Sequence, residues 1–195
     1  MPLIDVEHSM LLVIDAQQDF YPDRRTDVDR TALAGMFRRA AWVTAVASRL
    51  GVPVVVTEEE AAVNGPTAAV IRAALPDDAP VLPKATFGAA GDPDILAAIE
   101  ATGASTTVLA GLETDVCVAH SALGLKELGK RVVALHDVLY SPGAAHANGI
   151  RRLERNGVEL ISAKELAYDW LRTVEDARNF FRANRDLADP PGFAL

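Results

Sequence analysis

Cysteine is almost absent from this chain: Cys117 is the only one among 195 residues. A single cysteine cannot form an internal disulfide, so nothing in the sequence suggests an oxidising compartment. Positive charge is also scarce, because 19 lysines and arginines stand against 27 aspartates and glutamates, for a net charge of −8. Such a chain has no overall attraction for nucleic-acid phosphates or anionic lipids. We therefore expect a small-molecule partner, and neither nucleic acid nor membrane.

Long apolar runs are lacking as well, since no stretch approaches the roughly 20 residues that a membrane-spanning helix needs. The opening segment MPLIDVEHSM carries acids where a secretory signal carries lysines. We therefore expect a cytoplasmic protein. Glycine-rich phosphate loops of the G-x-G-x-x-G or G-x-x-x-x-G-K-[ST] type are also missing, so nucleotide chemistry has no support.

Short apolar or β-branched runs alternate with longer alanine-rich stretches of helical periodicity, which predicts an α/β protein with a parallel sheet. Runs such as LLVI and VPVVV are continuously apolar, as expected when helices cover both faces of the sheet. The predicted strands lie at about 10–15, 52–57, 80–83, 106–111, 131–137 and 158–161. The predicted helices lie at about 29–50, 66–75, 92–102, 117–129, 143–156 and 163–184.

The composition favours one domain, because 50% hydrophobic content over this length can form one sizeable core. We expect residues 1–185 to form that domain. The remaining segment 186–195, DLADPPGFAL, has two prolines and a glycine that end any helix. It is either a frayed terminus or an arm on a neighbouring subunit, which would cover Phe193 and Leu195.

Polar residues follow several predicted strands, at the edge where doubly wound sheets bind ligands. Asp15 ends the first strand, Glu58–Glu60 follow the second, Lys84 follows the third, Cys117 follows the fourth and Asp137 ends the fifth. Cys117 would lie in the first turn of a helix, where the helix dipole favours a thiolate. A buried Asp15 could accept the thiol proton, and Lys84 could supply the cation that keeps both groups charged.

Each of these residues also has a structural explanation. Cys117 could be a small core residue, Asp15 the cap of a turn and Lys84 a solvated loop lysine. The glutamates Glu58–Glu60 could select a cationic or amine-bearing substrate, although an acidic run is usually a solvated loop. His120 could pair with the thiol three residues before it, or simply pack on its helix.

Taken together, the segments LLVIDAQQDF, KATFGA and GLETDVCV resemble the isochorismatase-like hydrolase superfamily, in its cysteine hydrolase branch. The resemblance covers residues 10–165. It implies a three-layer α/β/α fold with a six-stranded parallel sheet of the Rossmann-like, doubly wound type. It also implies a catalytic triad of Asp15, Lys84 and Cys117 that cleaves amide C–N bonds, and a homo-oligomer.

Further positions come from the resemblance alone. The Leu112–Glu113 peptide bond matches a position that is cis in the family. The N–H groups of Glu113 and Cys117 would then form an oxyanion hole. Phe20 matches a position that often packs on the substrate, with core packing as the alternative. The expected substrate contacts are Phe20, Phe87 and Val116.

Departures from the family narrow the chemistry. Nicotinamidases carry metal-binding histidines after the second strand, where this chain has TEEEAAVNGP. The histidines here show no ligand spacing, so we expect no metal and no cofactor. They are His8, His120, His136 and His146. Isochorismatases that cleave a vinyl ether commonly have glycine at the position of Cys117, which argues against that reaction.

The sequence therefore predicts a cysteine amidohydrolase that acts on a small amide, ureide or carbamoyl compound through a thioester. One alternative is a vinyl ether hydrolase of the isochorismatase type, with Asp15 as the proton donor. Another is a non-catalytic binding or assembly protein on the same scaffold.

Overall fold

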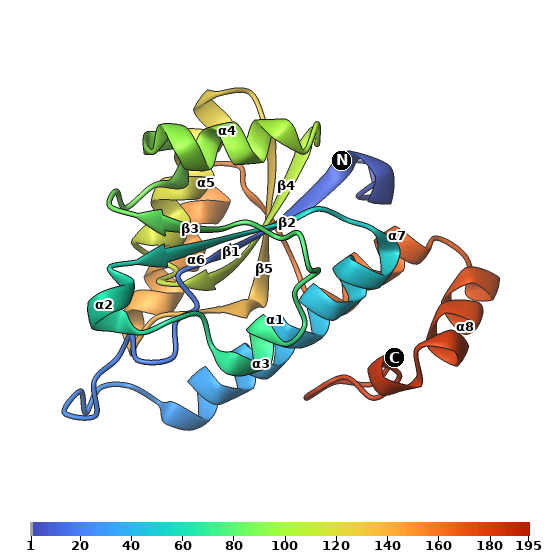
Figure 1. Ribbon diagram of the computed structural model, residues 1–195, viewed down its shortest axis with the longest axis horizontal. Helices are drawn as coiled ribbons and strands as arrows, with labels where there is room; N and C mark the ends of the chain where they lie inside the picture. The colour runs from blue at the N-terminus through green and yellow to red at the C-terminus, as the bar shows by residue number, and fades with distance from the viewer. Residues whose placement is uncertain (1) are drawn as a thin grey trace.

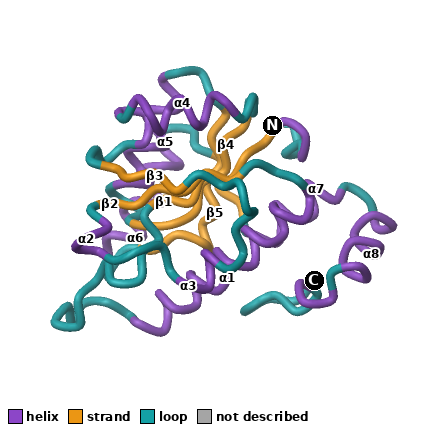
Figure 2. The backbone as a smooth tube through the Cα atoms, viewed as in Figure 1, coloured by secondary structure: helices purple, strands orange, loops and turns teal. Residues whose placement is uncertain are grey.

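Six parallel strands form the centre of the structure, a computed structural model that describes residues 2–195. They are β1 (Ser9–Ile14), β2 (Val54–Glu59), β3 (Val81–Lys84), β4 (Thr106–Leu112), β5 (Arg131–Tyr140) and β6 (Glu159–Ile161). Their order is β3-β2-β1-β4-β5-β6, and every neighbouring pair is parallel. Figure 2 shows the strands, in orange, gathered in the centre of the molecule. The chain moves outward from β1 to one edge and from β4 to the other, so the predicted doubly wound topology is confirmed.

Helices cover both faces of the sheet (Figure 1). On one face lie α1 (Arg30–Leu50), α3 (Ala69–Arg72) and α7 (Ala163–Leu171), and on the other α4 (Pro93–Ala101), α5 (Cys117–Glu127) and α6 (Ala144–Arg155). The short α2 (Ala61–Asn64) follows β2, and α8 (Val174–Ala183) packs on α7. Three 3-10 turns complete the chain: η1 (Val6–His8), η2 (Ala89–Gly91) and η3 (Arg185–Leu187). Within residues 2–195, no helix combines the length and apolar content needed to cross a membrane.

Strand β1 shows how the sequence builds a core on each side of the sheet. All of its residues are buried. Strand alternation sends Leu11 and Val13 into one apolar cluster and Met10, Leu12 and Ile14 into the other. Each such side chain contributes about 1.5–3 kcal/mol when fully buried. A continuous apolar run is therefore the favoured sequence for this strand, as predicted.

Two predicted helices are interrupted. The helix expected at 66–75 is reduced to α3, because Thr67 pairs in an isolated antiparallel bridge with the segment after β1. The helix expected at 163–184 is divided into α7 and α8. Between them Arg172 leaves the helical backbone with a φ of +62°, and the Thr173 side chain caps α8.

Strand β5 is longer than predicted and continues past Asp137 to Tyr140, with a shift of register against β4. Asp137 therefore lies within the strand instead of ending it. Its Oδ1 accepts a hydrogen bond from the Ala163 N–H at 2.9 Å. Because Ala163 is the first residue of α7, Asp137 serves to anchor that helix.

The segment 186–195 packs on α1 of its own chain (Figure 1). Trp42 Nε1 donates a hydrogen bond to the Leu187 carbonyl oxygen at 2.9 Å. The Trp42 ring also meets the Phe193 ring edge to face, with the centroids 5.2 Å apart. Phe193 and Leu195 thus gain apolar cover within one chain. A role of this segment as an arm on a neighbouring subunit stays a prediction.

Gly111 predicts a strong effect on stability. It has a φ of +124°, and an added Cβ would collide with the backbone carbonyl of Ile14. We expect Gly111→Ala to lower the free energy of unfolding by at least about 3 kcal/mol, from backbone strain and overpacking together. Gly51→Ala is the control, because Gly51 has a φ of +73° but open space around it, and should cost about 1–2 kcal/mol. Urea unfolding of both variants measures the difference, and equal losses would contradict the argument.

Candidate active site

The structure brings Asp15, Lys84 and Cys117 together at one edge of the sheet. Asp15 directly follows β1, Lys84 ends β3, and Cys117 begins α5 after β4. Because parallel strands end at the same edge, these three residues converge beside the switch point between β1 and β4. The Cys117 Sγ and one carboxylate oxygen each of Asp15 and Glu59 lie within 4.8 Å of one another. Asp15 Oδ2 lies 2.9 Å from Lys84 Nζ.

Asp15 is a fully buried carboxylate. Its Oδ1 accepts a hydrogen bond from Thr57 Oγ1 at 2.7 Å, while its backbone N–H donates to the Thr57 carbonyl oxygen. Burial raises the pKa of Asp15, and the Lys84 ammonium and the Thr57 hydroxyl offset part of this rise. Oδ2 forms the ion pair but accepts no well-aligned hydrogen bond from the described residues. It therefore has a lone pair free for chemistry.

Lys84 is a buried cation and not the solvated loop lysine considered above. Its side chain is fully buried. The ammonium donates a hydrogen bond to the Thr86 carbonyl oxygen at 2.6 Å and lies 3.6 Å from Glu59 Oε2. Burial alone would lower the pKa of Lys84, but the Asp15 carboxylate raises it on balance. The ammonium form is therefore maintained.

Glu59 is a member of the site that the sequence pattern left undecided. The Cys117 thiol donates a hydrogen bond to Glu59 Oε2 at 3.3 Å. The two glutamates beside Glu59 in the sequence have other surroundings. Glu58 accepts two hydrogen bonds from Thr67, and Glu60 is exposed. The signal that could have separated them is strand register, because Glu59 is paired with Lys84 between β2 and β3.

Gln17 holds Glu59 in place and was missed by the sequence analysis. Its buried amide accepts the Glu59 N–H at 2.8 Å and donates to the Glu59 carbonyl oxygen at 3.0 Å. The same Nε2 also donates to the Gly65 carbonyl oxygen at 2.6 Å. One side chain thus ties the segment after β1 to the end of β2 and the loop beyond it.

The surroundings of Cys117 favour its protonated thiol form. Burial raises its pKa, the Asp15 and Glu59 carboxylates raise it further, and Lys84 offsets only part of the rise. The expectation that Lys84 and the helix dipole keep the sulfur anionic is therefore wrong. The main reason is burial of the thiol, and the two carboxylates add to its effect on the pKa.

The Leu112–Glu113 peptide bond is trans, as are all peptide bonds among residues 2–195, so the expected cis bond is wrong. The Glu113 carbonyl oxygen instead accepts hydrogen bonds from the N–H groups of Val116 and Val118, at 3.2 and 3.1 Å. These bonds bind the start of α5 to the end of β4. The Cys117 N–H has no hydrogen-bond partner within the described part of the chain, which leaves this donor available to a ligand.

The three expected substrate contacts lie in different surroundings. Phe20 is partly buried and packs on the core and on Tyr21. Phe87 is 58% exposed, and its ring centroid lies 5.9 Å from that of His120. Val116 directly precedes Cys117 and is partly buried. His120 is exposed and faces Phe87, while the thiol hydrogen bonds to Glu59. The roles of Phe20, Phe87 and Val116 in binding stay predictions.

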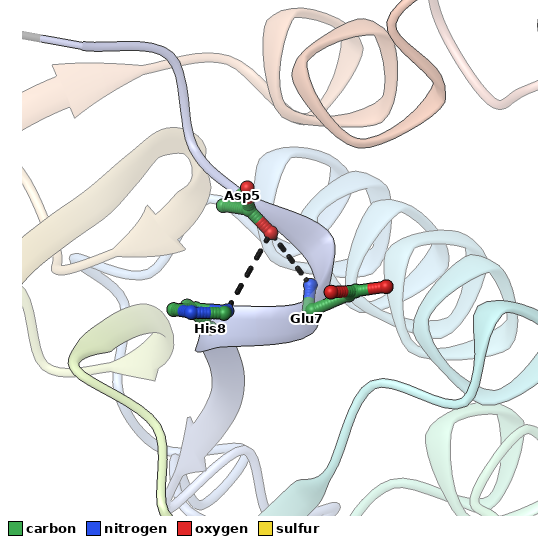
Figure 3. A group of neighbouring side chains, drawn as sticks. All are labelled: Asp5, Glu7 and His8. Carbon is green, nitrogen blue, oxygen red and sulfur yellow. Dashed lines mark hydrogen bonds and ion pairs between the residues drawn. The ribbon is translucent and has the colours of Figure 1, made fainter.

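A second group of metal-capable side chains lies at the other end of β1 (Figure 3). Asp5 caps η1 by accepting the Glu7 N–H at 2.9 Å, and its Oδ1 lies 3.8 Å from His8 Nδ1. All three side chains are exposed. Helix capping accounts for their proximity, so we assign no metal to this group.

Comparisons with known proteins place these observations in a family. The isochorismatase domain family matches residues 9–165. A probable hydrolase of Escherichia coli (strain K12), YcaC, is 29% identical over 134 residues. That match covers 66% of this chain and 64% of YcaC, so it spans a little under two thirds of the relative's length.

Solved structures share the fold. The MAR1 ribonuclease from Caenorhabditis elegans has a TM-score of 0.83 at 20% identity, over 99% of this chain and 97% of that chain. YcaC from Pseudomonas aeruginosa, with hexane-2,5-diol and covalent acrylamide, has a TM-score of 0.78 at 21% identity, over 95% and 90%. The E. coli YcaC structure, described as an octameric hydrolase of unknown specificity, has a TM-score of 0.74 at 21% identity, over 95% and 97%.

The raised pKa of Cys117 predicts slow alkylation of the folded protein. An ordinary cysteine has a pKa of about 8.5, so the thiolate fraction of Cys117 at neutral pH should be smaller than that of free cysteine. Iodoacetamide should therefore modify the native chain more slowly than the urea-unfolded chain. The rate should also keep rising at pH values where free cysteine is already fully ionised. Mass spectrometry gives the rate directly, because the chain has one cysteine, and faster modification of the native chain would refute this assignment.

Proposed function

We propose, from the premise that this chain belongs to the isochorismatase family of hydrolases, that it cleaves the C–N bond of a small amide, ureide or carbamoyl compound. The reaction would proceed through a thioester on Cys117. The observation that carries the proposal is the buried Asp15–Lys84 pair, 2.9 Å between charged atoms, beside the one thiol of the chain. A buried acid, a buried cation and a nucleophile in contact are costly to maintain without a use.

The first step is attack by the Cys117 sulfur on the carbonyl carbon. Because the thiol is protonated at rest, its proton must leave as the S–C bond forms. Asp15 Oδ2 is the acceptor, since it has a free lone pair and the raised pKa that suits a general base. Lys84 remains protonated and pairs with Asp15 whenever that carboxylate is ionised.

The tetrahedral intermediate carries its negative charge on the former carbonyl oxygen. The Cys117 N–H, at the start of α5, has no partner within the described residues and is the proposed donor. Loss of one such donor typically costs about 10²–10³ in kcat. The intermediate collapses as Asp15 returns its proton to the leaving nitrogen. A water then attacks the thioester with Asp15 as base, which releases the acid and restores the thiol.

Relatives add support at a coarser level. Acrylamide is an electrophile that carries an amide, and its covalent attachment in P. aeruginosa YcaC supports a reactive group within this fold that small amides can reach. The net charge of −8 and the acidic site disfavour RNA as a substrate here. The octameric E. coli relative supports assembly of this chain into a homo-oligomer. The exposed side chains of Val63, Val81 and Phe87 would gain cover in such an assembly.

Site variants test the thioester scheme. Cys117→Ser and Asp15→Asn should each lower the rate of ammonia release by about 10³-fold or more, because each removes a group that acts in the bond-breaking steps. A panel of small amides, carbamoyl amino acids and ureides identifies the substrate on the unaltered protein, and thermal unfolding verifies that the variants fold. His120→Ala is the control, since that exposed imidazole makes no contact with the sulfur in this scheme, and it should keep its activity.

Three results would contradict the scheme. Full turnover by Cys117→Ser would remove the nucleophile from the mechanism. Hydrolysis of isochorismate by Cys117→Ala would instead favour the vinyl ether reaction, which needs no thiol. Absence of turnover on every substrate, in a chain that also binds none of them, would favour the non-catalytic scaffold.

A further inference from the structure

We propose that Glu59 makes this site selective for substrates that carry a positive charge, such as an ammonium or guanidinium group, close to the carbonyl that is attacked. The inference rests on the proposed function and narrows its substrate class. Among the three glutamates Glu58–Glu60 at the end of β2, Glu59 is the one whose carboxylate contacts the thiol.

The charges of the site do not balance. Asp15 and Glu59 contribute two carboxylates, and Lys84 contributes one ammonium. Asp15 and Lys84 pair at 2.9 Å with both side chains fully buried, whereas Glu59 Oε2 lies 3.6 Å from the same ammonium. The Glu59 side chain is 24% exposed. The uncompensated negative charge therefore lies on the member of this group that solvent and ligands can reach.

Lys84 is already committed to other partners. Its ammonium lies 2.9 Å from Asp15 Oδ2 and donates a hydrogen bond to the Thr86 carbonyl oxygen, so Glu59 has no cation of its own. A bound ammonium or guanidinium brings several N–H donors together with the missing charge. A substrate carboxylate would bring neither, and would be repelled.

The position of Glu59 is fixed. Gln17 binds both its N–H and its carbonyl oxygen, and Asn64 Nδ2 donates to the same carbonyl oxygen at 2.9 Å. Glu58 is occupied by Thr67, and Glu60 is exposed with a φ of +41°. One glutamate of the run is thus built into the site, while the others are not.

A cation on Glu59 also has a consequence for the nucleophile. The Glu59 carboxylate is one of the groups that raise the pKa of Cys117. A substrate cation that pairs with it weakens this effect, so the thiol loses its proton more easily when a suitable substrate is bound. Selection of substrate and activation of the sulfur would then be one event.

Charged thiol reagents test the proposal without a known substrate. The 2-aminoethyl, methyl and 2-sulfonatoethyl methanethiosulfonates are cationic, neutral and anionic versions of one electrophile. In each case the Cys117 sulfur attacks the sulfenyl sulfur, a disulfide forms, methanesulfinate leaves, and the thiol proton passes to water. Mass spectrometry of the intact chain reports each rate constant.

We expect the unaltered protein to prefer the cationic over the anionic reagent by about tenfold or more beyond the preference of the urea-unfolded chain. Glu59→Gln should remove most of this excess and should speed modification by the neutral reagent at neutral pH. Glu60→Gln is the matched control, because it deletes the same charge from the adjacent, exposed residue, and it should keep the preference.

Three outcomes would overturn the proposal: no excess preference in the unaltered protein, an excess that survives Glu59→Gln, or an equal loss in Glu60→Gln. Should Glu59→Gln fail to fold, Glu59→Asp withdraws the carboxylate by one methylene and should give a preference between the two. The reagents require no turnover. A negative result with these reagents therefore does not contradict the hydrolase scheme. Turnover by Cys117→Ser would contradict that scheme, whatever charge the site prefers.

Discussion

The buried contact between Lys84 and Asp15 is the interaction on which the site depends. Taking both charges out of water is costly, and removing one partner from such a pair typically costs about 3–5 kcal/mol because the other is left unpaired. The sheet holds the two charges together, because β1 and β3 flank β2 and bring Asp15 and Lys84 to the same edge. Thr57 Oγ1 donates a hydrogen bond to the other Asp15 oxygen, and the Thr86 carbonyl oxygen accepts one from Lys84. The convergence of these side chains is therefore a product of strand order as much as of residue type.

With the ammonium committed to Asp15, little positive charge remains for the sulfur. The Glu59 carboxylate lies near the Lys84 ammonium and also accepts a hydrogen bond from the Cys117 thiol. In the proposed scheme the thiol rests in its protonated form, and the reaction depends on a carboxylate that can take the proton during attack. A resting thiol of this kind protects a lone cysteine from indiscriminate reaction, at the cost of requiring the right ligand to start the reaction.

The sequence was sufficient for the parts of this picture that follow from periodicity and strand ends. The six strands, the two-sided helical cover and the convergence of Asp15, Lys84 and Cys117 were all predicted. The break at Arg172 was not, because the amphipathic pattern continues through it. Glu59 could not be separated from its neighbours without the register between β2 and β3. The charge on the sulfur depends on distances to three ionised groups, and no pattern in the chain encodes those.

The amide of Gln17 has a consequence for how such a site can diversify. It hydrogen bonds to the backbone N–H and carbonyl oxygen of residue 59 and not to its side chain. The backbone at this position is therefore held in the same way whichever amino acid occupies it. The groups proposed to react lie elsewhere, with Asp15 directly after β1 and Cys117 at the start of α5. A lineage could therefore exchange the occupant of this one position, and with it the charge of the molecules admitted, while the bond-breaking apparatus and its scaffold stay as they are.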